Sequence, residues 1–320
     1  MDTLIIFILF PDYSKKYKYK SGGSFMIKEK AQMVGKEQVA NNPEKQEQDS
    51  ISQYDKDQHD IINQDLGFGL FNVGGVKKIY NAKSSLCIVG IKEYLLWKPI
   101  YDHVDTLDIC QKYKEKLCNC FVHLDIHIKR LYCQFANKLV CLDANLPSSE
   151  TAYFCSFEGG FKFNQFNDMD ENLGVCNTYF HESAHMIDYL MGNQIDNASS
   201  QAYMSEAIYQ DLQNAIKEIK YAMNCDEQTA QTVLTSILKR NMYDSNVVSD
   251  VFDGASRGKV HGRFRHSRDY WILRPADALG KEAFAEILAD IACQSTSHIE
   301  FTKRYLPNTI LKFNKIMKGK

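Results

Sequence analysis

The chain has 320 residues, of which 44% are hydrophobic, so it is long enough for one large or two ordinary domains with a sizeable core. Its 38 Lys and Arg residues nearly balance 40 Asp and Glu residues, and the net charge is −2. This balance gives no general reason to expect a nucleic-acid partner, and no apolar run is long enough to span a bilayer.

Residues 1–65 form a polar leader that we predict to be largely disordered, because its Lys-, Gln-, Asn- and Asp-rich composition cannot bury enough apolar area. Leu4–Phe10 is apolar, but Asp2 before it and Pro11 after it are atypical of a secretory signal. The ten cysteines of the chain are scattered, mostly in apolar runs, and we interpret them as free thiols. This usage favours a reducing, cytoplasmic compartment; a secreted effector or a virion-associated protein stays open as an alternative.

Residues 66–320 are predicted to form one domain with a strand-rich part, 66–170. Aromatic and β-branched residues cluster there in short runs: SLCIVGI, CFVHLDIHI, RLYCQF, KLVCLDA, AYFCSF and FKFNQF. In FVHLDIHI, residues 121–128, apolar side chains alternate with others, which is typical of a half-buried strand. A short turn at Ala136-Asn137 is expected to close a hairpin.

The second part of the domain, 171–320, has the periodicity of helices, so the fold class is α+β. A helix is predicted over 177–191, with Asn177 or Thr178 as N-cap and Gly192 as the stop. Amphipathic helices are further predicted over 200–224, 226–242, 280–295 and 306–319.

The segment HESAH, residues 181–185, has the spacing of a zinc site. Residues four apart project from the same side of a helix, so His181 and His185 can each offer a ring nitrogen to one ion. Glu182 then lies beside the open position of the ion, where it can take a proton from an attacking water and deliver it to a leaving amine. The motif therefore predicts one Zn²⁺ ion with Glu182 as general base.

A third protein ligand is expected, because catalytic zinc usually has three. Glu282, Glu286 and Asp290 recur every four residues and border the apolar face of their predicted helix. We expect this acidic edge to point into the site, with one carboxylate on the metal and the next holding a ligand histidine through its other ring nitrogen. The alternative is a solvated row of charges. Asp188 is an alternative third ligand, although a partner of a histidine or a packing cap suits its position better.

HESAHMID, followed about a hundred residues later by EAFAEILAD, resembles the catalytic domain of anthrax lethal factor and its relatives. The intervening SRGKVHGRFRHSRDYW is similar to a segment of zincin-like proteins encoded by phages and prophages. The resemblance covers roughly residues 160–315. It implies a zincin-like fold, with a small twisted sheet packed on the HExxH helix, and a gluzincin-like zinc metallopeptidase in which His181, His185 and Glu282 are the ligands.

The resemblance leaves several roles open. A different zincin pattern, Glu-x-x-x-Asp, would make Glu286 the ligand with Asp290 behind it. A tyrosine supports the transition-state oxyanion in lethal factor, and Tyr270 is the nearest candidate for this catalytic role. His266 is expected to contact substrate or to have a structural role. Residues 159–168 would form an edge strand that pairs with extended substrate.

These observations predict a zinc metalloendopeptidase that acts on a peptide or protein substrate, without a nucleic-acid or membrane partner. The alternative is a non-catalytic structural or morphogenesis protein of a phage or prophage that retains the zincin fold. A toxin-like peptidase acting on a host protein is a third reading.

Overall fold

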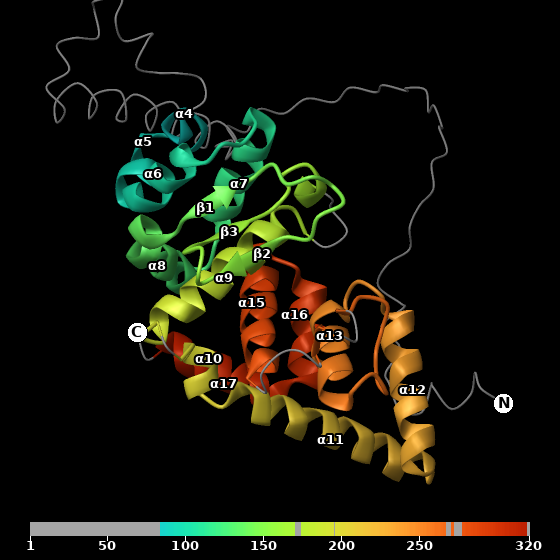
Figure 1. Ribbon diagram of the computed structural model, residues 1–320. Helices are drawn as coiled ribbons and strands as arrows, with labels where there is room; N and C mark the ends of the chain where they lie inside the picture. The colour runs from blue at the N-terminus through green and yellow to red at the C-terminus, as the bar shows by residue number, and fades with distance from the viewer. Residues whose placement is uncertain (1–83, 170–173, 195, 267–269, 272–276, 319–320) are drawn as a thin grey trace, which may run out of the picture. The chain divides into compact units, whose positions relative to one another are not determined.

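The computed structural model describes residues 84–169, 174–194, 196–266, 270–271 and 277–318. The predicted leader and its apolar run lie outside these residues. Within them, the protein is mixed α+β, mostly helical with a small three-stranded sheet, which agrees with the fold class expected from the sequence (Figure 1). In the part of the chain that is described, no helix is both long and apolar enough to cross a membrane.

The first described elements are helices, so the prediction of strands over residues 84–135 is wrong. They are α4 (Ser85–Val89), α5 (Ile91–Leu96), α6 (Lys98–Thr106), α7 (Gln111–His123) and α8 (Ile126–Phe135). The segment that alternates, 121–128, contains a helix boundary, because the Asp125 side chain accepts a hydrogen bond from the His127 amide at 2.8 Å and caps α8. The expected turn at Ala136-Asn137 is instead a 3₁₀-helix, η2 (Ala136–Lys138).

Three of the predicted strands exist in shortened form: β1 (Cys141–Asp143), β2 (Tyr153–Cys155) and β3 (Gly160–Lys162). Their order is β1-β3-β2, with β3 parallel to β1 and antiparallel to β2. The expectation that 159–168 is an edge strand is therefore wrong, since β3 is central and Phe161 and Phe163 are fully buried. A Cβ atom at Gly160 would lie 2.6 Å from the Val140 carbonyl oxygen, so glycine permits the close approach to β1.

Helix α9 (Asn177–Met191) has the bounds predicted from the sequence. It ends at Gly192, as expected, and the reason is steric: a side chain at Gly192 would collide with the backbone of Asp196, Asn197 and Ala198. The chain therefore turns tightly after α9 and enters the short helix α10 (Ala198–Gln201).

The start of α9 differs from the prediction that Asn177 or Thr178 is the N-cap. Cys176 occupies the cap position with a left-handed backbone, φ 65°, and its side chain makes no capping bond. The acceptor is Asp168, in the 3₁₀-helix η3 (Asn167–Met169), which takes the Thr178 amide at 2.6 Å and the Tyr179 amide at 2.9 Å. A remote carboxylate thus satisfies the first amides of α9.

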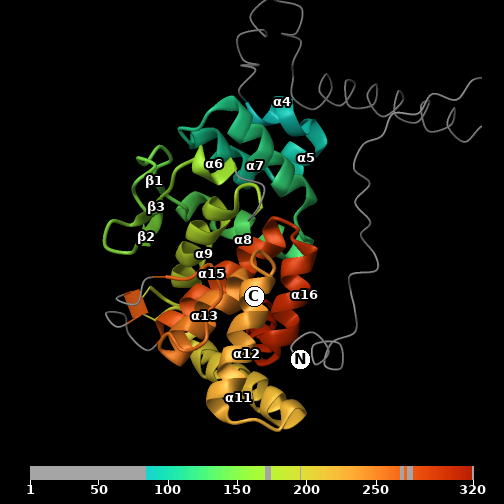
Figure 2. The ribbon, with the colours of Figure 1, turned by 90° about the vertical axis from the view of Figure 1, so that its right-hand side faces the viewer.

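Longer helices make up the rest of the described chain: α11 (Met204–Met223), α12 (Glu227–Arg240), α13 (Asn246–Ser256), α15 (Ala278–Ala292), α16 (Thr296–Tyr305) and α17 (Pro307–Lys318). Helix α9 contacts β2 and β3 as well as α15, and Figures 1 and 2 show it between the sheet and α15. Both α9 and α15 are largely buried, and they carry the residues of the candidate site.

Candidate metal centre

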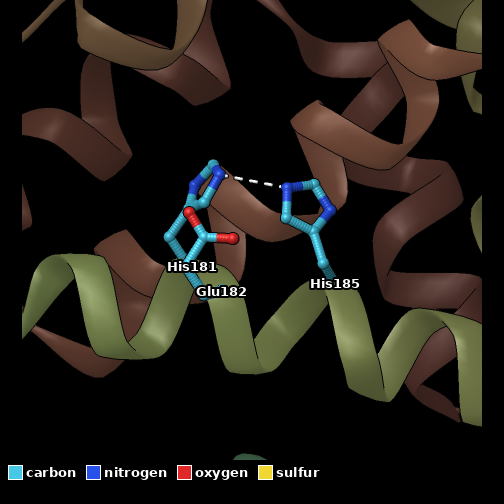
Figure 3. Close-up of side chains that lie close together, drawn as sticks. All are labelled: His181, Glu182 and His185. Carbon is cyan, nitrogen blue, oxygen red and sulfur yellow. Dashed lines mark hydrogen bonds between the residues drawn. The ribbon is translucent and has the colours of Figure 1, made fainter. Parts of the chain in front are cut away.

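Helix α9 presents His181 and His185 side by side, as the four-residue spacing predicts (Figure 3). The Nε2 atoms of the two rings are 3.0 Å apart, so one ring donates a hydrogen bond to the other in the absence of an ion. Glu182, 6% exposed, lies beside them, and all three side chains offer a ligand atom within 4.8 Å of one another. The HExxH motif therefore forms a compact cluster of potential metal-ligand atoms on a buried helix.

Helix α15 brings Glu282 to both histidines. Its Oε2 atom lies 3.5 Å from Nε2 of His181 and 3.4 Å from Nε2 of His185. Glu282 is 4% exposed, and within the described residues Oε2 has no hydrogen-bond partner. A buried carboxylate oxygen without a hydrogen bond costs free energy, so such atoms are rare in folded proteins. Glu282 Oε2 is therefore a candidate ligand atom for a cation.

The three atoms fit a tetrahedral zinc ion. Ligands at ~2.0–2.1 Å from such an ion lie about 3.3 Å from one another. The two Nε2 atoms and Glu282 Oε2 are separated by 3.0, 3.4 and 3.5 Å. A single ion held by these three atoms would give Glu282 Oε2 its missing partner.

Glu286 lies one turn further along α15, behind His181. Its Oε1 atom is 3.7 Å from Nδ1 of His181, and its Oε2 atom accepts a hydrogen bond from Asn246 Nδ2 of α13 at 3.1 Å. Glu286 thus faces Nδ1 of His181, the ring nitrogen that does not contact His185 or Glu282. The arrangement suits an outer partner that orients a ligand histidine.

Asp290 is buried but turns away from the histidine pair. Its Oδ1 atom lies 3.2 Å from Nδ1 of His298, on α16. Of the three carboxylates on the acidic edge, Glu282 and Glu286 reach the site, and none is a solvated charge, since all are less than 9% exposed. The interpretation of Asp290 as a partner of a metal-bound Glu286 has no support in this geometry.

Tyr270 contacts Glu282 directly, since its hydroxyl donates a hydrogen bond to Glu282 Oε1. The ring of Tyr270 stacks on His266, with centroids 4.0 Å apart. The tyrosine expected to act on the oxyanion therefore holds the candidate third ligand in this structure.

His266 is fixed by a residue that the sequence analysis missed, Asp250 of α13. The two oxygens of Asp250 lie 2.8 Å from His266 Nδ1, and Oδ1 also accepts the His266 amide at 2.7 Å. Asp250, His266 and Glu282 form a second group of ligand atoms within 4.8 Å of one another. The signal that could have revealed Asp250 is an aspartate inside the apolar segment NVVSDVF, which becomes α13.

Asp188 is a packing cap and does not reach the histidines through a hydrogen bond. It is fully buried and accepts the Ser199 amide at 2.8 Å and the Ser199 hydroxyl at 2.5 Å. These bonds tie α9 to the start of α10. These contacts favour the interpretation of Asp188 as a cap over its interpretation as a third metal ligand.

The electrostatics of the cluster favour a bound cation. Burial would lower the pKa of His181, but the nearby carboxylates of Glu282, Glu286 and Glu182 raise it well above its usual range. Burial would raise the pKa of Glu282, but the charges of His185 and His181 hold it well below its usual range. The carboxylates of the cluster therefore stabilise positive charge at the histidine pair.

Glu182 has the pKa direction that suits a base. Burial raises the pKa of its carboxyl group above the usual value, against the lowering effect of His181 and His185. A carboxylate with a raised pKa holds an abstracted proton more readily at neutral pH.

Comparison of the chain with protein-family models, with curated proteins and with solved structures gives no match. The zincin-like fold and the lethal factor resemblance thus stay predictions from the motifs.

Proposed function

We propose that the protein is a zinc-dependent metallopeptidase in which His181, His185 and Glu282 hold one zinc ion. The observation that carries the proposal is the triangle of two Nε2 atoms and the unpartnered, buried Glu282 Oε2, with sides of 3.0–3.5 Å. Glu282 is favoured over Glu286 as third ligand because its oxygen is close to both histidines, whereas Glu286 faces Nδ1 of His181 alone.

When bound, the ion supplies Lewis acidity toward water and toward a substrate carbonyl. Glu182 would accept the proton of the attacking water and deliver it to the leaving amine, a role that its buried position beside the two histidines supports. Glu286 orients His181, and Tyr270 fixes Glu282 through its hydroxyl. The peptide as substrate rests on the resemblance of the two helix motifs.

The test combines metal content with cleavage. Purified wild-type chain, Glu182→Gln and, as a surface control, Glu227→Gln are dialysed against zinc, analysed for metal by mass spectrometry, and incubated with a peptide library. We expect about one zinc per chain in all three and cleavage by the wild type and the Glu227→Gln control only, with Glu182→Gln slower by at least about 10²-fold.

Three results would contradict the proposal. Wild-type chain that takes up no zinc would remove the metal site. Zinc uptake without cleavage of any library peptide would favour the non-catalytic structural protein, and cleavage that survives in Glu182→Gln would remove the assigned base.

A further inference from the structure

A cavity of about 480 Å³ lies between α8, α15, α16 and α17. Its volume is within the range of small-molecule pockets, ~300–1,000 Å³. None of the proposed zinc ligands lines it; α15 contributes Ile287, Asp290 and Ile291 instead. The cavity is therefore separate from the candidate metal centre, although both use α15.

The surface of the cavity wall is mostly apolar, although half of the lining residues are polar or charged. Isoleucines from all four helices contribute to it, together with one aromatic ring: Ile128, Ile287, Ile291, Ile299, Ile310 and Phe313. Branched aliphatic side chains offer contact area to a hydrocarbon, but no hydrogen bonds. The main body of a ligand that fits here is apolar.

Two lysines among the lining residues, Lys303 of α16 and Lys318 of α17, are exposed. Among the described residues, no carboxylate lies within ion-pairing distance of either ammonium group. Two carboxylates also line the cavity. Asp290 pairs with His298 through Oδ1, while its buried Oδ2 has no hydrogen-bond partner among the described residues, and the exposed Asp125 accepts the His127 amide. The two ammonium groups thus outnumber Asp125, the one lining carboxylate for which the described residues show no ion pair.

We propose that this cavity binds a medium-chain fatty carboxylate, with the acyl chain against the isoleucines and the carboxylate at Lys303 and Lys318. The inference goes beyond the peptidase proposal and requires neither zinc nor catalysis. The apolar wall and the two cations together define the ligand class, because a neutral hydrocarbon would leave the lysines unused and an alkylammonium would be repelled by them.

The probe is a series of free carboxylates, hexanoate, octanoate and decanoate, titrated into the full chain by calorimetry below their micellar concentrations. Each buried methylene contributes ~0.8 kcal/mol, so the dissociation constant is expected to fall about fourfold per added methylene. Decylammonium is the charge control and should bind at least roughly tenfold more weakly than decanoate.

Matched variants locate the site. Ile299→Trp fills the cavity and should abolish binding, whereas Leu311→Trp, at an exposed position of α17 that does not line the cavity, should leave it unchanged. The double variant Lys303→Glu, Lys318→Glu should weaken decanoate binding roughly tenfold, and Lys315→Glu, outside the cavity on α17, should not. His185→Ala removes a proposed zinc ligand. It should bind decanoate like the wild type, because only decanoate bound to the zinc ion, and not decanoate bound in the cavity, would be lost in this variant.

Any one of these results would overturn the inference: an affinity that does not depend on chain length, equal affinity for decylammonium, undiminished binding by a folded Ile299→Trp variant, or loss of binding in His185→Ala. Circular dichroism and a thermal melt establish that each variant is folded. Binding to anionic lipid vesicles without uptake of free decanoate would also overturn it.

Discussion

Glu282 shows how much of the site depends on single atoms. One of its oxygens faces both histidines without a hydrogen bond, and the other accepts the Tyr270 hydroxyl. Glu286, four residues later, makes contact with His181 and Asn246 instead. Two glutamates of the same helix therefore have different contacts, and in the proposed site one is a ligand and the other is the partner of a ligand.

Amide substitutions separate these roles. Glu286→Gln should weaken zinc affinity by roughly 10–100-fold, the usual cost of losing an outer partner, because the histidine ligands stay in place. Glu282→Gln should weaken it by a larger factor, because the third anionic ligand is lost. Competition with a chromophoric chelator measures both values; a larger loss in Glu286→Gln would assign Glu286 as the ligand.

The residues of the site were predictable where chemistry fixes their spacing. His181, Glu182 and His185 are found in a five-residue motif, and Glu282 and Glu286 lie on the edge of one helical face. Asp250 and Asn246 were not predictable, because only the packing of α13 against α15 brings them to the site. Asp290 lies in the same row as the two glutamates, yet its partner is set by α16.

At the scale of elements, three buried aspartates cap helices from other parts of the chain. Asp168 caps α9, Asp188 caps α10 and Asp211 caps α17, where it accepts the Thr309 amide at 2.9 Å. Each carboxylate satisfies a helix start and ties two elements together. Because each capping carboxylate lies ten or more residues from the amide that it caps, local sequence patterns do not reveal it. For this reason the predicted N-cap of α9 was wrong.

Removing the cap of α9 should cost more than removing an exposed one. Asp168→Ala leaves the amides of Thr178 and Tyr179 without their acceptor, and it is expected to lower the free energy of unfolding by about 2–3 kcal/mol. The control is Asp226→Ala, since Asp226 is exposed and caps α12 through Thr229; its loss should cost clearly less than the loss of Asp168. Urea denaturation measures both, and equal losses would contradict the role of Asp168.

The Asp168 carboxyl group also gives a dependence on pH. Burial raises its pKa to about 6, from a usual value of 3.8, more than hydrogen bonds from Tyr113, Tyr179 and Thr178 lower it. Between pH 4 and 6 the folded chain keeps a proton that the unfolded chain releases, so the contribution of this group to stability is lost as pH rises.

Asp168→Asn removes this titration. The unfolding free energy of the wild type minus that of the variant should therefore fall by roughly 2–3 kcal/mol from pH 4 to pH 7. Denaturation curves at a series of pH values measure it. A difference that is constant or rises with pH would contradict the raised pKa.

The N-terminal helices show where pattern reading failed. In α7 and α8 the buried residues Tyr113, Leu117 and Phe121, then Ile128, Tyr132 and Phe135, recur at helical spacing. The short window of FVHLDIHI alternates by composition, but the helical period becomes visible only over a longer stretch. Tertiary packing then overrides the strand preference of the aromatic and β-branched residues.

For the molecule as a whole, a metal would connect α9 and α15, two helices that already pack together. An α+β protein with a helical C-terminal part could be predicted, because the long amphipathic segments there have a clear helical period. The helices α4 to α8 at the start of the described chain could not be predicted from short sequence windows. The order β1-β3-β2 could not be predicted either, because it depends on pairing between separate segments.

Zinc removal should therefore destabilise the folded chain. At a free zinc concentration about a thousand times the dissociation constant, binding contributes ~4 kcal/mol, which a chelator such as EDTA would abolish. We expect a lower melting temperature with EDTA for the wild type and no change for His185→Ala. Identical wild-type melting curves with and without EDTA would contradict a metal that joins α9 to α15.

The pairing of α9 with α15 also sets an order of events during synthesis. His181 and Glu282 are about a hundred residues apart in the chain, so a nascent polypeptide displays both histidines and the general base well before the third ligand exists. At ~5–20 residues per second this interval lasts on the order of 5–20 s. If the proposed zinc site exists, it can therefore be completed only after translation has passed α15, and the growing chain would lack the proposed peptidase centre before then.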